Sequence, residues 1–110
     1  MTDRFHLNIP FAVTANFYLV DVDEHNGVTE FWPGTHTLGV RGLTKSYELE
    51  EPYILESALE ERRQIRPPIR PSVAKGSVVL RDLRLWHCGV PNRQTVPRIM
   101  FSMVILAKSV

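Results

Sequence analysis

Residues 85–92 read Leu-Trp-His-Cys-Gly-Val-Pro-Asn, and this stretch decides how the rest of the chain is interpreted. A short apolar run ends at His87, and a turn-rich loop, Gly89 to Pro97, leads to Arg98 at the start of a second apolar run. Such a loop allows the two runs to pair as neighbouring antiparallel strands. We therefore expect the imidazole of His87 and the guanidinium of Arg98 to point into one cavity.

These two side chains suit a particular chemistry. Imidazole is a favoured ligand of non-haem iron, and arginine can hold a carboxylate through two parallel hydrogen bonds. Together they suggest an iron site that uses a dicarboxylate co-substrate. Two other interpretations stay open: His87 as a hydrogen-bonded core histidine, and Arg98 in a structural ion pair with Asp82 or Glu30.

A second histidine lies near the start of the chain. His6 and Asn8 are two residues apart, so on a strand their side chains share a face. Non-haem iron oxygenases bind the metal through two histidines and one carboxylate. Asn8 stands where that pattern has a carboxylate. Its amide oxygen can bind a hard cation but adds no negative charge, so we expect weaker iron binding than an aspartate would give.

Several stretches, in the same order, resemble the C-terminal part of the phytanoyl-CoA dioxygenase family of Fe(II)/2-oxoglutarate oxygenases. The family has His-x-Asp where this chain has His6-Leu7-Asn8, and Asn-Gly followed by Pro-Gly-Ser-His where this chain has Asn26-Gly27 and Pro33-Gly34-Thr35-His36. Residues 75–82, 85–87 and 92–98 resemble the segment that carries the family's second iron histidine and its 2-oxoglutarate arginine.

The resemblance implies a mostly β fold, a double-stranded β-helix of the jelly-roll, cupin-like type with one short helix. It implies a dioxygenase that hydroxylates a small organic or secondary-metabolite substrate, with Fe(II) as cofactor and 2-oxoglutarate as co-substrate. The implied iron ligands are His6, Asn8 and His87, Arg98 would bind 2-oxoglutarate, and no catalytic residue is expected beyond this metal site. His36 is expected to order its loop rather than bind iron.

Family members also carry a long segment before the first iron ligand. We therefore expect residues 1–110 to form a single domain that is incomplete at its N-terminus. A missing strand would leave an unpaired sheet edge, through which self-association is possible.

Two other functions stay open. A catalytically impaired remnant or truncated pseudoenzyme of the same family, acting as a binding module, is favoured by Asn8. An unrelated jelly-roll binding domain of the cupin type would explain the apolar strands but not the ordered set of motifs.

Composition narrows the choice further. The 110 residues are 44% hydrophobic and 23% charged, which is typical of a globular domain. The net charge of +1 argues against nucleic acid as a partner. A lone cysteine, Cys88, forms no internal disulfide, and we find neither a signal peptide nor an apolar run of bilayer length. We therefore expect a cytoplasmic protein that does not bind membranes.

The elements expected from the sequence are mostly strands. Asn26-Gly27 is the strongest hairpin signal, and Cys88 is expected to pack in an apolar environment on the side opposite His87. The final strand is apolar on both faces, which is typical of a strand buried in the centre of a sheet. The expected ranges are strands at 14–22, 28–31, 77–81, 85–88 and 98–107, and one helix at 53–64. The helix is expected to be solvated, with a basic end formed by Arg62, Arg63, Arg66 and Arg70.

Overall fold

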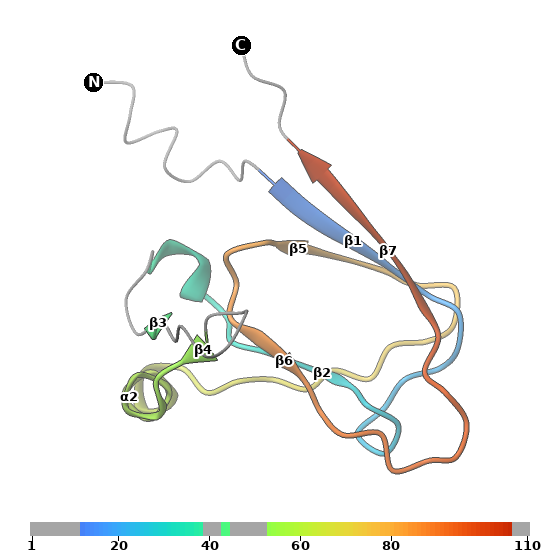
Figure 1. Ribbon diagram of the computed structural model, residues 1–110, viewed down its shortest axis with the longest axis horizontal. Helices are drawn as coiled ribbons and strands as arrows, with labels where there is room; N and C mark the ends of the chain where they lie inside the picture. Colours follow the sequence, from blue (N-terminus) through green and yellow to red (C-terminus); the bar gives the residue numbers. More distant parts are fainter. Residues whose placement is uncertain (1–11, 39–42, 45–52, 107–110) are drawn as a thin grey trace.

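The computed structural model describes residues 12–38, 43–44 and 53–106. This part of the chain is mostly β with one α-helix, as expected from the sequence (Figure 1). The strands are β1 (Ala12–Tyr18), β2 (Thr29–Phe31), β3 (Leu43–Thr44), β4 (Tyr53–Ile54), β5 (Val78–Asp82), β6 (His87–Gly89) and β7 (Met100–Leu106), with a 3-10 helix η1 (Thr35–Thr37) and the α-helix α2 (Glu56–Ile65).

The strands form three antiparallel sheets. The largest has the order β5-β1-β7, and Figure 1 shows it opposite the smaller sheet formed by β2 and β6. A third, two-residue ladder joins β3 to β4. Single bridges from Val22 to Val73 and from Phe31 to Ile69 tie the connector after α2 to the segment between β1 and β2 and to β2 itself. The pairing is therefore almost entirely between strands that are distant in sequence.

The hydrophobic core lies between the two larger sheets. Tyr18, Val22 and Val28 are each at most 2% exposed, and side chains from β5 and β7, Val79 and Met100, pack against them. Because side chains alternate along a strand, the face of β1 that carries Tyr18 also carries Asn16 and Thr14. This face of the larger sheet, directed at the core, is called the inner face below.

The Asn26-Gly27 turn forms, but it does not make the expected hairpin. Gly27 has φ +92°, a conformation that favours glycine, and the backbone N–H groups of Asn26 and Val28 both donate to the carbonyl of Asp23. The strands on either side belong to different sheets, since β1 ends at Tyr18 and β2 pairs with β6. The turn thus carries the chain from one sheet to the other.

The helix is shifted from its expected position. It begins at Glu56 rather than Tyr53, because residues 53–54 pair with β3 instead. It ends at Ile65, in keeping with the two prolines at 67 and 68, which disfavour helical conformation in the residue before them. None of its residues is buried.

The prediction for the last strand is wrong in one respect. β7 has the expected apolar sequence, but it lies at the edge of its sheet and not in the centre. Its large side chains are 46–68% exposed from residue 101 to residue 106, with Ser102 the only polar one. Among the described residues, β7 pairs with β1 alone.

Candidate functional site

His87 begins β6, opposite Phe31 of β2; it is exposed, and its ring lies within reach of Arg81 on the larger sheet. The ring atom Nδ1 lies 2.9 Å from the carbonyl oxygen of Leu85 and 3.2 Å from Nη1 of Arg81 on β5. A carbonyl only accepts hydrogen bonds, so a proton on Nδ1 donates to Leu85 and leaves the Nε2 lone pair free. In that tautomer His87 is a competent metal ligand through Nε2.

The strand around His87 is fixed by the Pro-Gly-Thr-His loop. The Thr35 side chain is 1% exposed, and its Oγ1 both accepts from the backbone N–H of Trp86, at 2.8 Å, and donates to the carbonyl of Trp32, at 2.6 Å. The backbone N–H of Trp32 in turn donates to the carbonyl of Trp86. One buried hydroxyl therefore holds the residue next to His87 against the end of β2.

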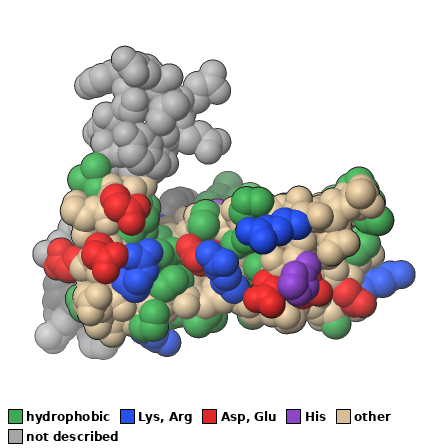
Figure 2. Space-filling model, turned by 90° about the horizontal axis from the view of Figure 1, so that it is seen from below, with side chains coloured by type: hydrophobic (Ala, Val, Ile, Leu, Met, Phe, Trp, Pro, Cys, Tyr) green, Lys and Arg blue, Asp and Glu red, His purple; other side chains and the backbone are tan. Residues whose placement is uncertain are grey.

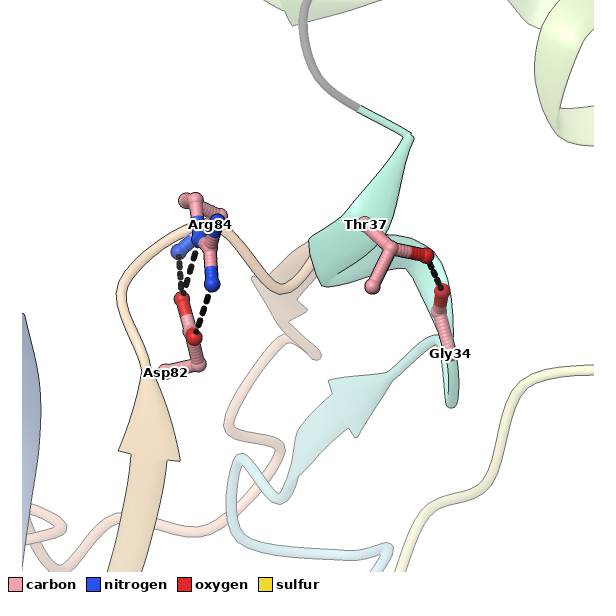
Figure 3. Close-up of polar contacts among 4 residues, drawn as sticks. All are labelled: Gly34, Thr37, Asp82 and Arg84. Atoms are coloured by element: carbon pink, nitrogen blue, oxygen red, sulfur yellow. Dashed lines mark hydrogen bonds and ion pairs between the residues drawn. The ribbon is translucent and has the colours of Figure 1, made fainter. Parts of the chain in front are cut away.

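The turn between β5 and β6 is closed by an ion pair, drawn in Figure 3 beside the Gly34–Thr37 turn. Arg84 donates to both carboxylate oxygens of Asp82, at 3.0 and 2.8 Å, and its backbone N–H donates to the same group. The hydrogen bond from the Arg84 side chain is the main cause that holds the pKa of Asp82 below its usual range, despite burial. This turn brings Arg81 and His87 together.

Arg98 lies just before β7, and its position excludes the expected ion-pair alternatives. Asp82 pairs with Arg84, and Glu30 pairs with Arg70 at 2.9 Å. Arg98 instead donates through Nη1 to the sulfur of Met100, at 3.9 Å. Because Met100 packs on the core and Arg98 is two residues earlier, its side chain is on the inner side of the strand.

The Arg98 side chain passes close to the Asn26-Gly27 turn. A Cβ on Gly27 would lie 3.3 Å from Nε of Arg98 and equally close to the carbonyl oxygen of Val90. Val90 follows His87 by three residues, so the two levels are about 10 Å apart along the strand. Whether His87 and Arg98 share one cavity stays a prediction. The structure leaves His87 exposed and places Arg98 on the inner side of its strand, at a different level.

The opposite face of β6 carries a separate polar cluster. Cys88 is exposed and its thiol donates to Glu30, so the expected apolar packing of Cys88 is wrong, whereas its orientation away from His87 is confirmed. Burial and the Glu30 carboxylate raise the pKa of the Cys88 thiol. Burial would raise the pKa of Glu30 as well, but hydrogen bonds from Arg70, Cys88 and Trp32 outweigh it and the pKa is lowered.

The two arginines in the last turn of α2 make more contacts than expected from the sequence, because both lie against the loop after β2. Arg62 donates to the carbonyl of Pro33 at 2.8 Å, and the Arg63 guanidinium lies 5.3 Å from the centre of the Trp32 ring. On the face of the molecule drawn in Figure 2, basic and acidic side chains lie next to one another. These arginines attach α2 to the loop that fixes His87.

The remaining site residues have different outcomes. His6 and Asn8 lie outside the described residues, and within 12–38, 43–44 and 53–106 no group of three or more His, Cys, Asp or Glu residues could hold a metal ion. His36 lies in η1, near enough for its charge to help lower the pKa of Asp82. A surface hollow of about 350 Å³ contains His25 but neither His87 nor Arg98.

Sequence reasoning missed two residues at this site. Arg81 was read only as the end of a strand, although its place six residues before His87, across a short turn, was a usable signal. Thr35 was quoted as part of a motif without a role of its own. Its two backbone contacts depend on the pairing of β2 with β6, which the sequence does not reveal.

The sequence profile of the phytanoyl-CoA dioxygenase family matches residues 3–100. The chain belongs to this family. Both this membership and the resemblance seen in the sequence are therefore confirmed.

Solved structures show a similar fold. EctD from S. alaskensis with bound Fe is 24% identical, with a TM-score of 0.67 over 87% of this chain and 31% of that one. The same protein with 2-oxoglutarate and 5-hydroxyectoine is 22% identical, with a TM-score of 0.68 over 96% of this chain and 36% of that one. AviO1 from Streptomyces viridochromogenes Tue57 is 23% identical, with a TM-score of 0.51 over 86% of this chain and 34% of that one. The chain thus spans about a third of the length of these proteins.

No helix in the described part of the chain is long and apolar enough to cross a membrane.

Proposed function

We propose that this protein acts as an Fe(II)/2-oxoglutarate-dependent dioxygenase that hydroxylates a small organic or secondary-metabolite substrate. The observation that carries the proposal is the orientation of His87: its Nδ1 is engaged by the Leu85 carbonyl, and its other nitrogen is left for a metal. Family membership supports the same reaction class. In this proposal the two larger sheets are parts of a double-stranded β-helix.

The residues that would hold the iron are His87, His6 and Asn8. When bound, Fe(II) with 2-oxoglutarate supplies the oxidising chemistry. The contribution of the chain is to position both: His87 is held by Thr35 and the Leu85 carbonyl, and Arg98 offers a guanidinium on the inner side of β7. Since Arg98 has no carboxylate partner among the described residues, it can bind the distal carboxylate of 2-oxoglutarate in a bidentate contact.

The level difference between the two residues supports these roles. A dicarboxylate that reaches from a metal at His87 toward Arg98 must run along the inner side of the smaller sheet. Val28, which follows Gly27, and the partly buried Val90 lie at the level of Arg98 and would exclude water from that end of the path.

The first test concerns Asn8. Because an amide brings no charge to the metal, we expect Asn8→Asp to bind Fe(II) or Mn(II) roughly tenfold more tightly than the unmodified chain, or better. Anaerobic calorimetric titration, with succinate release measured in parallel, checks this. His87→Ala should abolish binding in both backgrounds, whereas His25→Ala, in an exposed turn, should change nothing.

The outcomes separate two functions. Tight metal binding and rapid succinate release by the unmodified chain would show that Asn8 is a fully competent ligand. No gain from Asn8→Asp in a folded protein would favour the second candidate, a catalytically impaired binding module of the same family, for which the neutral side chain at position 8 is the specific observation.

A further inference from the structure

Arg81 places a second guanidinium beside the candidate iron ligand. It is two residues from Val79, which packs against the core, so both side chains are on the inner face of the larger sheet. Its Nη1 reaches across to Nδ1 of His87 on the opposite sheet, at 3.2 Å. The charge is thus located between the two sheets, next to the proposed metal position.

This guanidinium has no acidic partner among the described residues. The neighbouring carboxylate of Asp82 is taken by Arg84, and that of Glu30 by Arg70. Nε of Arg81 is buried and makes no hydrogen bond within the described part of the chain. Burial lowers the pKa of Arg81, but a guanidinium keeps its proton in proteins, so the positive charge stays. A partly buried cation without an anion is costly unless a ligand neutralises it.

The surrounding inner face is polar and neutral. Thr14 of β1 is paired directly with Arg81, and its Oγ1 is also buried without a partner among the described residues. One register step along, Ser102 donates to the side-chain oxygen of Asn16, at 2.8 Å. Neutral hydroxyl and amide groups around one cation are suited to an anionic ligand, because these groups carry no negative charge that would repel it.

The hydrogen bonds of His87 show when Arg81 becomes available. The Leu85 carbonyl can only accept and the Arg81 guanidinium can only donate, so a single ring nitrogen cannot satisfy both. The tautomer that binds a metal through Nε2 carries its proton on Nδ1 and donates to Leu85. This tautomer does not require a bound metal, and in it Nη1 of Arg81 has no acceptor on His87 and is free to donate to a ligand.

We infer that Arg81 binds the carboxylate of the molecule that is oxidised, so that the substrate is an organic acid held between the two sheets next to His87. Arg98 is assigned to the co-substrate because it lies near Gly27, at the other level. The inference rests on the proposed function for the identity of the ligand as substrate. The carboxylate site itself depends on Arg81 alone.

The test uses the full chain without metal, with 3-phenylpropionate as the probe and 3-phenylpropionamide as its neutral counterpart. We expect the acid to bind at least roughly tenfold more tightly than the amide, and Arg81→Gln to remove this preference. Arg81→Lys keeps the charge and should retain part of it. Arg93→Gln, in an exposed loop, is the matched control and should bind the acid like the unmodified chain.

A second arm separates the two possible carboxylates. Arg98→Gln should weaken binding of 2-oxoglutarate to the Mn(II)-loaded chain and leave binding of 3-phenylpropionate to the metal-free chain unchanged. Equal binding of the acid and the amide, or a preference that follows Arg98 instead of Arg81, overturns the inference. Because the acid–amide comparison needs neither metal nor turnover, failure of the dioxygenase proposal would leave its result intact.

Discussion

The two larger sheets hold their strands in different ways. The β2–β6 sheet has three-residue strands, but Thr35, Trp32 and Trp86 fix it through buried side-chain and backbone hydrogen bonds. The β5-β1-β7 sheet has long ladders, yet its outer strand β7 is exposed on both faces. The position of His87 therefore depends on a few specific contacts, whereas the position of β7 depends on backbone pairing with β1. Substitutions should therefore act unequally in the two sheets.

Thr35→Val is expected to have the largest effect. It keeps the volume of the side chain but leaves the Trp86 N–H without its acceptor, at a cost of about 2–3 kcal/mol in the free energy of unfolding. Thr37→Val is the matched control, because its hydroxyl donates to Gly34 in an exposed turn (Figure 3) and should cost little. Equal midpoints for the two variants in urea unfolding would contradict the role assigned to Thr35.

Gly27→Ala should have the next largest effect, and it should displace the Arg98 side chain just before β7. The alanine must adopt a positive φ and crowd Arg98 and the Val90 carbonyl, at a combined cost of about 1–2 kcal/mol. Gly76→Ala has a similar φ of +88° with no atom within 4 Å, so it isolates the backbone cost. Only Gly27→Ala should also weaken the binding of 2-oxoglutarate, which calorimetry measures. Equal binding by the two variants would contradict the assignment of Arg98 as a ligand of 2-oxoglutarate.

Acid should destabilise the polar cluster around Glu30, on the face of β6 opposite His87, because the Glu30 carboxylate becomes protonated. Its pKa is lower in the folded chain than in the unfolded one, so its stabilising contribution is fully present above the unfolded pKa and is lost as the pH falls through the folded pKa. Glu30→Gln should therefore reduce the free energy of unfolding at pH 7 by up to about 1 kcal/mol. It should also make this free energy less dependent on pH below about 4.5. Glu60→Gln, on the exposed side of α2, should keep the dependence of the unmodified chain in unfolding measured from pH 7 to pH 3.

Self-association through a sheet edge stays a prediction, and β7 is the strand that we expect to carry it. Ile105→Lys, at a position that is 50% exposed, should change the free energy of unfolding by less than about 0.5 kcal/mol but lower the apparent mass in concentrated solution. Ile65→Lys, an exposed apolar residue at the end of α2, serves as control. Sedimentation that is unchanged by Ile105→Lys would exclude this edge.

Much of the fold could be predicted from the sequence because its signals are local. Runs of β-forming residues placed β1, β5 and β7 to within a few residues, and the prolines after α2 placed its end. The long-range pairing could not be predicted, because nothing local indicates that β1 pairs with β5 and β7 rather than with β2. For the same reason an apolar strand was assigned to the centre of a sheet, although its neighbours decide whether it is covered.

The candidate site shows the same division. His87 and its separation from Cys88 follow from strand alternation, which any short stretch reveals. The partners of Asp82 and Glu30 depend on which arginine lies within reach in three dimensions, and these were Arg84 and Arg70, not Arg98. The placement of His6 and Asn8 stays a prediction, since both lie outside the described residues.

The paired indoles give the chain an optical reporter. Trp32 and Trp86 are its two tryptophans; both are buried, with ring centres 6.4 Å apart, and Trp86 directly precedes the candidate iron ligand. Their emission therefore reports on the smaller sheet alone, while far-ultraviolet circular dichroism averages over every strand. A paramagnetic ion held by His87 would quench this light at close range, so metal arrival and the loosening of this sheet can both be followed without adding a dye.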